Sequence, residues 1–369
     1  MRVLVCPDKF RGTLTAMQAA EAIEHGWRRT RPDDLIEVVP LADGGEGTLD
    51  VLVPRETSDG SRRVQRTVAG PLGRPVTAEI GVRGSVGVVE MARASGLALL
   101  DADRRDPRRT TTRGTGELMV AALEEGAQRL LVCLGGSATN DGGVGMAAAL
   151  GGRFLDGNGH PIADGGEALL DVARIDVGPV LTMLRTVDVV GVTDVDNSLC
   201  GPSGASATYG PQKGASPEDV ILLDRALRHL AAVADRDLGV DRSHEPGAGA
   251  AGGLGFGLVA FAGARLRPGV EVVMEAVGFE ESLRTADLVI TGEGSLDEQS
   301  LRGKVPAGVL GAARVAGVPV AIACGVASVW PEGAVVRSLV DRVGRGSALA
   351  DARRSLELVA QELAEEFPI

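Results

Sequence analysis

Short apolar runs that end in a polar, glycine-containing loop recur along the chain. Examples are RVLVCPD, LIEVVPLADGG, VGVVEMA, RLLVCLGGSATNDGG, TVDVVGVTDVDN, ADLVITGEGS and VPVAIACGVAS. Their apolar positions are continuous rather than alternating, which is typical of strands that are buried on both faces of a parallel sheet. These runs therefore predict buried and mainly parallel strands.

Segments with helical periodicity lie between these runs. Three of them are TAMQAAEAIEHGWRRT at 15–30, TGELMVAALEEGA at 115–127 and KVPAGVLGAARVAG at 304–317. An alternation of strands and helices predicts the α/β class with mainly parallel sheets. In such folds ligands bind beyond the carboxyl ends of the strands, where this sequence carries its acids and glycines.

The length of 369 residues favours two domains. A polar stretch marked by glycine and proline at 58–76 and the segment EESLRTAD at 280–287 indicate the boundaries. We therefore expect a discontinuous flavodoxin-like (Rossmann-like) domain made of residues 1–65 and 284–369. A second α/β domain, residues 66–283, is expected to be inserted into it.

Composition limits the partners that the protein can have. Hydrophobic residues make up 44% and charged residues 24%, as in globular proteins, and the net charge is −12. A negative net charge argues against binding to nucleic acid or to an anionic membrane, because both need clustered cations. The uncharged stretch at 247–264 is long enough to span a bilayer, but its glycines and alanines favour a closely packed buried helix.

Cysteine usage points to a reducing compartment. The four cysteines lie far apart in the sequence and form no CxxC motif, which predicts a reduced, cytoplasmic protein without structural zinc. The apolar run near the amino terminus is too short for a signal peptide.

Several well-known nucleotide-binding and catalytic motifs are either absent or lack the neighbouring elements that they require. GAGAAG at 247–252 matches the dinucleotide fingerprint, but DRSHEP precedes it instead of a buried strand. The P-loop pattern and the GxSxG elbow of hydrolases are both absent from the sequence. A nicotinamide-dependent dehydrogenase of 2-hydroxy acids is therefore an alternative and not the preferred hypothesis.

One acidic string occurs twice, as VPLADGGEGTLDV at 39–51 and as PIADGGEALLDV at 161–172. The first copy follows an apolar strand pattern and leads through Thr48 into an apolar helix. The second follows Asp-Gly-Asn-Gly, which is turn chemistry. We therefore expect the first copy to be functional.

Four loops at strand ends carry the remaining candidate chemistry. PDKFRGTLTA places Asp8, Lys9 and Arg11 before a helix start, which favours an anion site. GGSATNDGG offers glycine amides and hydroxyls that can wrap a phosphate. The loops GVTDVDNSL and TGEGSLDEQSLRGKVP add more acids and a lysine. Each residue alone could cap a helix, but together they favour a phosphoryl-transfer site without a Walker motif.

An ordered series of motifs resembles the bacterial glycerate kinases. They are PDKFRGTLTA, PLADGGEGT, GPLGRPV, RRTTTRGTGEL, GGSATNDGG, YGPQKGAS, PGAGAAGGLG and TGEGSLDEQSLRGKVP, spanning residues 3 to about 325. The resemblance implies ATP-dependent phosphorylation of D-glycerate to 2-phosphoglycerate by two α/β domains, one inserted in the other. This chain departs from the family pattern at Lys9, where serine is common, at Arg11, where lysine is common, and in VTDVDNSL, where CDVxNPL is usual.

The resemblance and the chemistry of phosphoryl transfer together suggest a role for each candidate. The expected catalytic residues are Asp194 as the base, Asp43 as the second choice for that role, and Lys304. The expected substrate-binding residues are Asp8, Lys9, Arg11 and Asn197. The expected nucleotide-binding residues are Gly135, Gly136, Ser137, Thr139 and Asn140. The expected Mg²⁺ ligands are Asp43, Glu46, Glu293 and Asp297.

Other functions stay open at this point. Phosphorylation of the 3-hydroxyl of glycerate and a non-catalytic carboxylate-binding protein are alternatives besides the dehydrogenase. ATP, Mg²⁺ and D-glycerate are the expected small-molecule partners, and no nucleic acid or membrane is expected. The sequence does not decide whether the chain forms a homo-oligomer.

Overall fold

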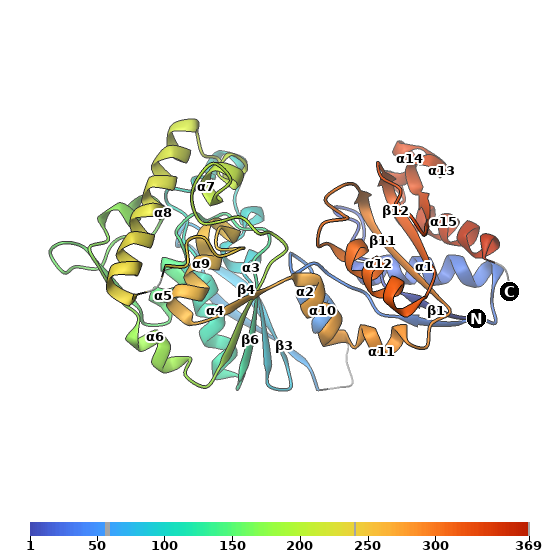
Figure 1. Cartoon of the computed structure of the whole chain (residues 1–369), viewed down its shortest axis with the longest axis horizontal. Coiled ribbons are helices and arrows are strands. Elements are labelled where there is room, and N and C mark those ends of the chain that lie inside the picture. Colours follow the sequence, from blue (N-terminus) through green and yellow to red (C-terminus); the bar gives the residue numbers. More distant parts are fainter. Residues whose placement is uncertain (56–59, 240, 368–369) are drawn as a thin grey trace. The chain divides into compact units, whose positions relative to one another are not determined.

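The computed structural model describes residues 1–55, 60–239 and 241–367 of the chain (Figure 1). Helices and strands alternate and the strands form mainly parallel sheets, which confirms the predicted α/β class. The chain divides into two compact units. Unit 1 comprises Met1–Asp43 and Pro268–Ile369, and unit 2 comprises Gly44–Arg267.

Unit 1 is built around a five-stranded parallel sheet in the order β13-β12-β11-β1-β2. Its strands are β1 (Arg2–Val5), β2 (Leu35–Val38), β11 (Leu288–Leu296), β12 (Val320–Ala327) and β13 (Ala334–Ser338). Its helices are α1 (Ala16–Thr30), α10 (Gly269–Val277), α11 (Phe279–Leu283), α12 (Val305–Ala316), α13 (Leu339–Val343), α14 (Arg345–Ala350) and α15 (Ala352–Glu366). Counted along the chain within this unit, the strand order is the 2-1-3-4-5 order of flavodoxin-like folds.

Helix α1 shows how the sequence determines the packing of unit 1. It begins with a capping box, in which the Thr15 hydroxyl accepts from the Gln18 N–H at 3.2 Å and the Gln18 side chain accepts from the Thr15 N–H at 3.0 Å. Ala19, Ile23 and Trp27, spaced four residues apart, are buried in a core shared with α15 and the sheet. α1 and α15 therefore cover the same face of the sheet (Figure 1).

Unit 2 contains a six-stranded sheet in the order β10-β9-β6-β5-β4-β3 and a small hairpin, β7-β8. Its strands are β3 (Arg62–Ala69), β4 (Pro75–Arg83), β5 (Val86–Glu90), β6 (Arg129–Cys133), β7 (Arg153–Leu155), β8 (Arg174–Asp176), β9 (Asp188–Val192) and β10 (Arg265–Arg267). Its helices are α2 (Thr48–Leu52), α3 (Ala92–Ser95), α4 (Arg113–Glu124), α5 (Val144–Ala149), α6 (Gly178–Met183), α7 (Ala205–Tyr209), α8 (Pro217–Leu238) and α9 (Ala250–Ala262). Strands β5, β6, β9 and β10 are parallel, and β3 and β4 are antiparallel.

The unit boundaries differ from those expected after residues 65 and 283. The segment 44–65 belongs to unit 2, because β3 lies in its sheet and Leu49 of α2 packs on β4, 2.5 Å from where a Cβ at Gly81 would lie. The segment 268–283 belongs to unit 1, because Val270 of α10 packs in the same way on Gly308 of α12.

The polar stretch at 58–76 is not a linker where it is described. Positions 58 and 59 lie outside the described residues, and residues 60–76 contain β3 and the start of β4. The arginines of β3 lie at the sheet edge, where Arg62 and Arg66 both bond Glu125. Their charge made the strand resemble a polar boundary segment in the sequence.

The glycine- and alanine-rich stretch at 247–264 forms the buried helix α9, as predicted. Within the described part of the chain, no helix is long and apolar enough to cross a membrane. Ala251, Gly252 and Gly253 have φ values of 54°, 69° and 90°, so the first turn of α9 is left-handed. This turn packs on the loop after β6, because the Gly142 N–H donates to the Gly252 carbonyl at 3.1 Å.

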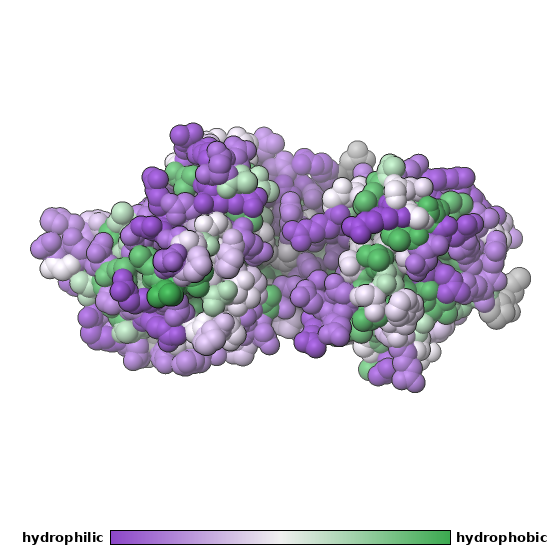
Figure 2. All heavy atoms as spheres, turned by 90° about the horizontal axis from the view of Figure 1, so that it is seen from above, coloured by the Kyte–Doolittle hydropathy of each residue, from purple (hydrophilic) through white to green (hydrophobic). Residues whose placement is uncertain are grey.

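The face shown in Figure 2 is mainly hydrophilic over both units, with smaller hydrophobic areas between the polar ones. Some large apolar side chains are exposed, for example Ile221 at 72% and Trp330 at 66%. The four cysteines are free thiols.

The left-handed turn of α9 generates a stability prediction. A Cβ at Gly252 would lie 1.9 Å from the Thr139 carbonyl oxygen, at a φ of 69°. Gly263, at the end of the same helix, has a similar φ of 65°, but the nearest atom to its Cβ would be 3.9 Å away. We expect Gly263→Ala to cost about 1–2 kcal/mol of unfolding free energy through backbone strain alone. Gly252→Ala should cost roughly 1–3 kcal/mol more through overpacking.

Urea unfolding of both variants and the wild type, followed by circular dichroism, measures this difference. Equal losses of stability in the two variants would show that the contact with Thr139 is not tight.

Candidate active site

In unit 1 the predicted residues gather after β1 and around the second half of β11, in which Glu293 lies. These neighbouring strands form the point at which the strand order reverses, where ligands bind in folds of this class. The loop after β1 is fixed to β11, because the Asp8 N–H donates to the Gly292 carbonyl at 2.8 Å. Gly294 lets the next turn lie across β11, since a Cβ there would be 3.2 Å from the Arg11 backbone nitrogen.

Three carboxylates of this region, Asp8, Asp43 and Glu293, act on one another electrostatically. Burial is the main cause that raises the pKa of Asp8 to about 7, with the charges of Asp43 and Glu293 adding to it and Lys9 opposing it. Burial also raises the pKa of Glu293 to about 7, against the opposing effects of Ser300 and Lys304. Glu293 Oε1 is buried and finds no hydrogen-bond partner among the described residues.

Two lysines accompany these carboxylates. Lys9 Nζ lies 3.9 Å from Asp8 Oδ1 and 3.7 Å from Asp43 Oδ1. Lys304 is the half-buried residue before α12, and its charge lowers the pKa of Glu293. The structure thus brings five predicted residues of unit 1 into one group of opposite charges.

Arg11 and Asp297 differ from this group. Arg11 is exposed, and its side chain makes no hydrogen bond or ion pair with the described residues. Asp297 is used by its own turn, where Oδ1 accepts from the N–H groups of Gln299 at 2.8 Å and Ser300 at 3.2 Å. Helix capping was the alternative that the sequence left open for such a residue, and the carboxylate of Asp297 bonds its own turn instead.

In unit 2 the loop GGSATNDGG, residues 135–143, follows β6 almost directly. Gly135 packs on the first acidic string, because a Cβ there would be 2.5 Å from Gly45 Cα. Gly136 has a φ of 75°. The N–H groups of Gly136 and Ser137 bond no acceptor among the described residues. Consecutive amides in such a turn suit an anion, so this end of the loop fits a phosphate.

Thr139 and Asn140 have a different use from the one that we predicted. Both side chains are fully buried. The Thr139 hydroxyl donates to the Ala251 carbonyl at 3.3 Å, and the Asn140 amide donates to the Ser206 hydroxyl at 3.0 Å. Buried polar groups need internal partners, so these two side chains hold the loop to its neighbours.

Asp141, the acid next to Asn140, is buried. Its carboxylate accepts from the N–H groups of Thr112, Gly143 and Gly145 at 2.7, 3.2 and 3.3 Å, and from the Thr112 hydroxyl at 2.9 Å. Burial raises the pKa of Asp141, and these hydrogen bonds oppose the shift. Asp141 therefore joins the loop to the start of α4.

Lys213 is a buried base that the sequence analysis missed. It is 2% exposed, and its Nζ donates to the Thr139 carbonyl at 2.7 Å. Burial lowers the pKa of Lys213 to about 7, with the charge of Asp141 opposing the shift. The motif YGPQKGAS contains this lysine, but a motif does not reveal that its charge lies inside the protein.

The loop after β9 carries Asp194 and Asn197. Asp194 is exposed, and its charge helps to raise the pKa of Tyr209, for which burial is the larger cause. Asn197 is engaged within the loop: its amide donates to the Ser203 carbonyl at 2.7 Å, and its Oδ1 accepts from the Tyr209 hydroxyl at 2.6 Å. Asn197 thus shapes the loop that carries Asp194.

The two acidic strings differ in their surroundings. In the second copy, Asp164 is paired with Arg113 at 2.6 Å and Glu167 with Arg108 at 2.7 Å. In the first copy Glu46 is exposed. The helix α2 follows it, and one hydrogen bond from the Leu49 N–H holds the start of this helix. This N–H donates to the carboxylate of Glu90 at 2.8 Å. The second copy therefore joins loops of unit 2, as the turn chemistry before it suggested.

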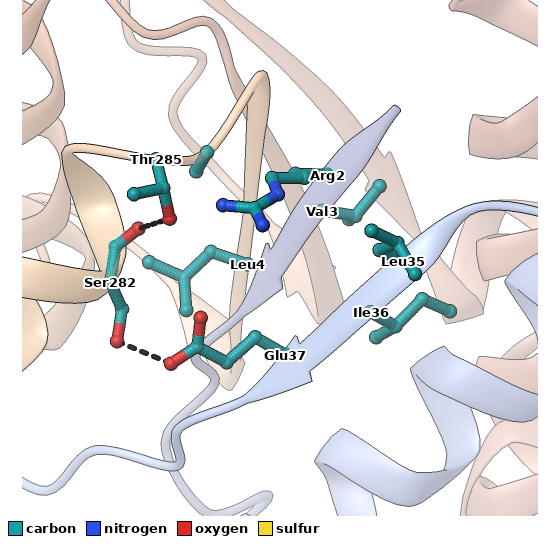
Figure 3. Close-up of a pocket in the computed structure, with 9 residues that line it drawn as sticks. Arg2, Val3, Leu4, Leu35, Ile36, Glu37, Ser282 and Thr285 are labelled. Carbon is teal, nitrogen blue, oxygen red and sulfur yellow. Dashed lines mark hydrogen bonds between the residues drawn. The ribbon is translucent and has the colours of Figure 1, made fainter.

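A pocket of about 160 Å³ opens beside β1 and β2 in unit 1 (Figure 3). Figure 3 shows Glu37 on β2 accepting a hydrogen bond from the Ser282 hydroxyl, at 2.5 Å, at one side of this pocket. None of the predicted site residues lines it.

The donor set fits Mg²⁺ in one respect. Among the described residues no group of three or more His, Cys, Asp or Glu side chains could hold a metal ion by itself. Mg²⁺, however, is usually bound by one or two carboxylates together with phosphates and water. The unpartnered Oε1 of Glu293 and the nearby Asp43 are oxygen donors of that kind.

Comparison with known proteins places these features in a family. The sequence model of the glycerate kinase family matches residues 3–367. The chain is 49% identical to a glycerate kinase of Bacillus subtilis (strain 168) over 322 residues, which are 87% of this chain and 84% of the relative. It is 46% identical to a glycerate 2-kinase of Escherichia coli (strain K12), over 85% of this chain and 82% of the relative.

A solved structure resembles the whole chain. It is a crystal structure described as that of a presumptive glycerate kinase 2 from Salmonella typhimurium LT2, with a TM-score of 0.87 and 42% sequence identity. The match covers 99% of this chain and 97% of the other. With a family match over almost its full length, the chain belongs to the glycerate kinase family.

Proposed function

We propose that this protein transfers the γ-phosphate of ATP to the 2-hydroxyl of D-glycerate, giving 2-phosphoglycerate and ADP. The observation that carries the proposal is the group of carboxylates and lysines at the carboxyl ends of β1 and β11. The choice of the 2-hydroxyl rests on the Escherichia coli relative, which is named a glycerate 2-kinase. A cytoplasmic location stays a prediction from cysteine usage.

The cations of unit 1 suit an anionic substrate. Lys9 and Lys304 are held beside carboxylates, whereas the exposed guanidinium of Arg11 is available for a carboxylate or a phosphate. A guanidinium can grip either anion through two parallel hydrogen bonds. We therefore assign Arg11 and Lys9 to glycerate and Lys304 to the transferred phosphate.

The nucleotide is assigned to the first half of the loop after β6, in which Gly136 is exposed and Ser137 is buried. The N–H groups of Gly136 and Ser137 have no acceptor among the described residues, and the glycines of the loop let a phosphate come close to the backbone. The side chains of Thr139 and Asn140 hold the second half of the loop in place through their hydrogen bonds to Ala251 and Ser206.

Asp194 is the base that we favour, with Asp43 as the alternative. An exposed carboxylate at a strand end can approach a substrate hydroxyl and orient it for attack. Asn197 belongs to this arrangement as the residue that shapes the Asp194 loop.

When bound, Mg²⁺ neutralises the charge of the nucleotide phosphates. Glu293 and Asp43 are the residues that would hold it, because their oxygens are hard ligands and Glu293 has one without a partner. Glu46 stays a predicted Mg²⁺ ligand. Asp297 is a less favourable ligand, because its Oδ1 already accepts a hydrogen bond from the Gln299 N–H in its own turn.

The dehydrogenase alternative is less favourable. Residues 241–249, which precede α9, form no strand, and the first turn of α9 packs on the Thr139 carbonyl. A nucleotide at the GAGAAG segment would lack the strand-to-helix turn that its phosphates need.

The proposed reaction is tested by incubating the purified protein with ATP, Mg²⁺ and D-glycerate. We expect glycerate-dependent release of ADP and a single product whose phosphorus NMR spectrum matches 2-phosphoglycerate. The spectrum of 3-phosphoglycerate would move the reaction to the other hydroxyl. Binding of glycerate without ADP release would instead favour a carboxylate-binding protein.

Asp194→Asn tests the base. The amide keeps the shape of the side chain but cannot accept the proton, so kcat should fall by roughly 10² to 10⁴. The Kd for ATP should change little. Asp196→Asn, at an exposed acid in the same loop, is the matched control and should keep near-normal turnover. Normal turnover of Asp194→Asn would transfer the role to another acid, with Asp43→Asn as the next variant.

The raised pKa of Glu293 predicts a pH-dependent cost of stability. Its pKa rises from 4.5 to about 7 on folding, so the folded state favours the protonated acid. The cost is absent at pH 4, grows as the pH rises from about 4.5 to 7, and is complete above 7. Glu293→Gln should therefore stabilise the protein at pH 8, by up to about 3 kcal/mol at 1.36 kcal/mol per pKa unit, and leave it unchanged at pH 4.

Thermal unfolding with a metal chelator and without nucleotide measures this difference. The exposed Glu298, changed to Gln, is the control and should show the same small effect at both pH values. A Glu293→Gln variant that loses stability at pH 8 would contradict the assignment of a strained carboxylate.

A further inference from the structure

Lys213 is a buried basic residue to which the proposed reaction gives no role. It ends the 3₁₀ helix Pro211–Lys213, and its ammonium lies beneath the loop after β6. A buried ammonium is costly unless it is bonded, and its bond is to the Thr139 carbonyl at 2.7 Å. Asp141, the charged residue that acts on Lys213, is already held by four hydrogen bonds.

The use of lysine in this chain is itself informative. The sequence contains 35 arginines and three lysines: Lys9, Lys213 and Lys304. Lys9 and Lys304 belong to the charged group at the ends of β1 and β11. An ammonium is a compact point charge, whereas a guanidinium is a wide planar fork. In this chain, lysine therefore stands at positions where a small cation fits better than a guanidinium, and the buried position 213 is one of them.

The Thr139 carbonyl is held from two sides. Lys213 donates to its oxygen, and the left-handed turn at Gly252 lies so close that a Cβ would be 1.9 Å from that oxygen. The preceding residue is fixed as well: the Ala138 N–H donates to the Ser95 carbonyl at 2.9 Å, and its own carbonyl accepts from the Thr110 hydroxyl at 2.8 Å. Residues 138 and 139 therefore form an anchored base for the half of the loop that precedes them.

We propose that Lys213 is a positioning residue of the nucleotide-binding loop. Through its bond to the Thr139 carbonyl it fixes the backbone that directs the N–H groups of Gly136 and Ser137 toward the phosphates of ATP. The inference rests on the proposed function, in which this loop binds the nucleotide.

Lys213→Met removes the hydrogen bond and the charge while keeping an unbranched side chain of similar length. A hydrogen bond of a charged group contributes about 1.5–3 kcal/mol, so the Kd for ATP, measured by calorimetry, should rise about 10- to 100-fold. The KM for D-glycerate should stay within about threefold, because that substrate is assigned to unit 1. Lys213→Gln keeps an N–H donor without the charge and should give a smaller rise, at least about threefold.

A core variant separates positioning from general stability. Ile175, in the small hairpin of unit 2, is 4% exposed, and Ile175→Ala should lower the unfolding temperature without changing the Kd for ATP. The proposal is overturned if Lys213→Met binds ATP within about twofold of the wild type. It is also overturned if Ile175→Ala weakens ATP binding as much as Lys213→Met does. Should Lys213→Met fail to fold, Lys213→Gln decides, and an unchanged Kd for ATP overturns the proposal.

The wild type distinguishes this inference from the proposed function. If it binds ATP but does not phosphorylate glycerate, the reaction is wrong, and the Lys213 variants still decide the role of the lysine. If it does not bind ATP at all, both fail together.

Discussion

Close contact between backbone segments is the constraint on which the candidate residues of each unit depend. In unit 1 Gly292, which holds the loop after β1 through its carbonyl, is paired with Ala323 inside the sheet, and a Cβ at Gly292 would be 2.1 Å from the Ala323 carbonyl oxygen. In unit 2 the same holds for Gly135 against Gly45 and for Gly252 against Thr139. Glycine is the residue that permits such contacts, and the chain contains 52 of them.

Buried charge is the second feature that the two units share. Asp8 and Glu293 in unit 1, and Asp141 and Lys213 in unit 2, are each at most 7% exposed, and burial shifts the pKa of each toward its neutral form. Such groups lower the free energy of unfolding unless hydrogen bonds or opposite charges compensate. Proteins keep strained groups mainly where function uses them. In a chain with a net charge of −12, an anionic substrate needs cations held at defined places.

The fold class and the contents of the loops could be predicted from the sequence, because continuous apolar runs and glycine-rich strand ends are local patterns. The β3-β4 hairpin could not, since Arg62 and Arg66 make an edge strand look like a polar linker until Glu125, some 60 residues later, pairs with them. The unit boundaries shifted for the same reason. The packing partners of Leu49 and Val270, which are Gly81 and Gly308, are distant in the sequence, and composition says nothing about them.

The sequence by itself determined which chemical groups stand at the ends of the strands: acids and lysines after β1 and β11, and glycines with hydroxyls after β6. Only the tertiary structure decided which of these groups are buried in the protein interior. Thr139 and Asn140 look like ligand-binding residues in the motif, yet both are buried, and Thr139 bonds Ala251, which lies 112 positions away. Lys213, 74 positions from its acceptor, is enclosed by segments that no local pattern connects. Burial depends on which remote segments pack together, and that information is absent from any short stretch of sequence.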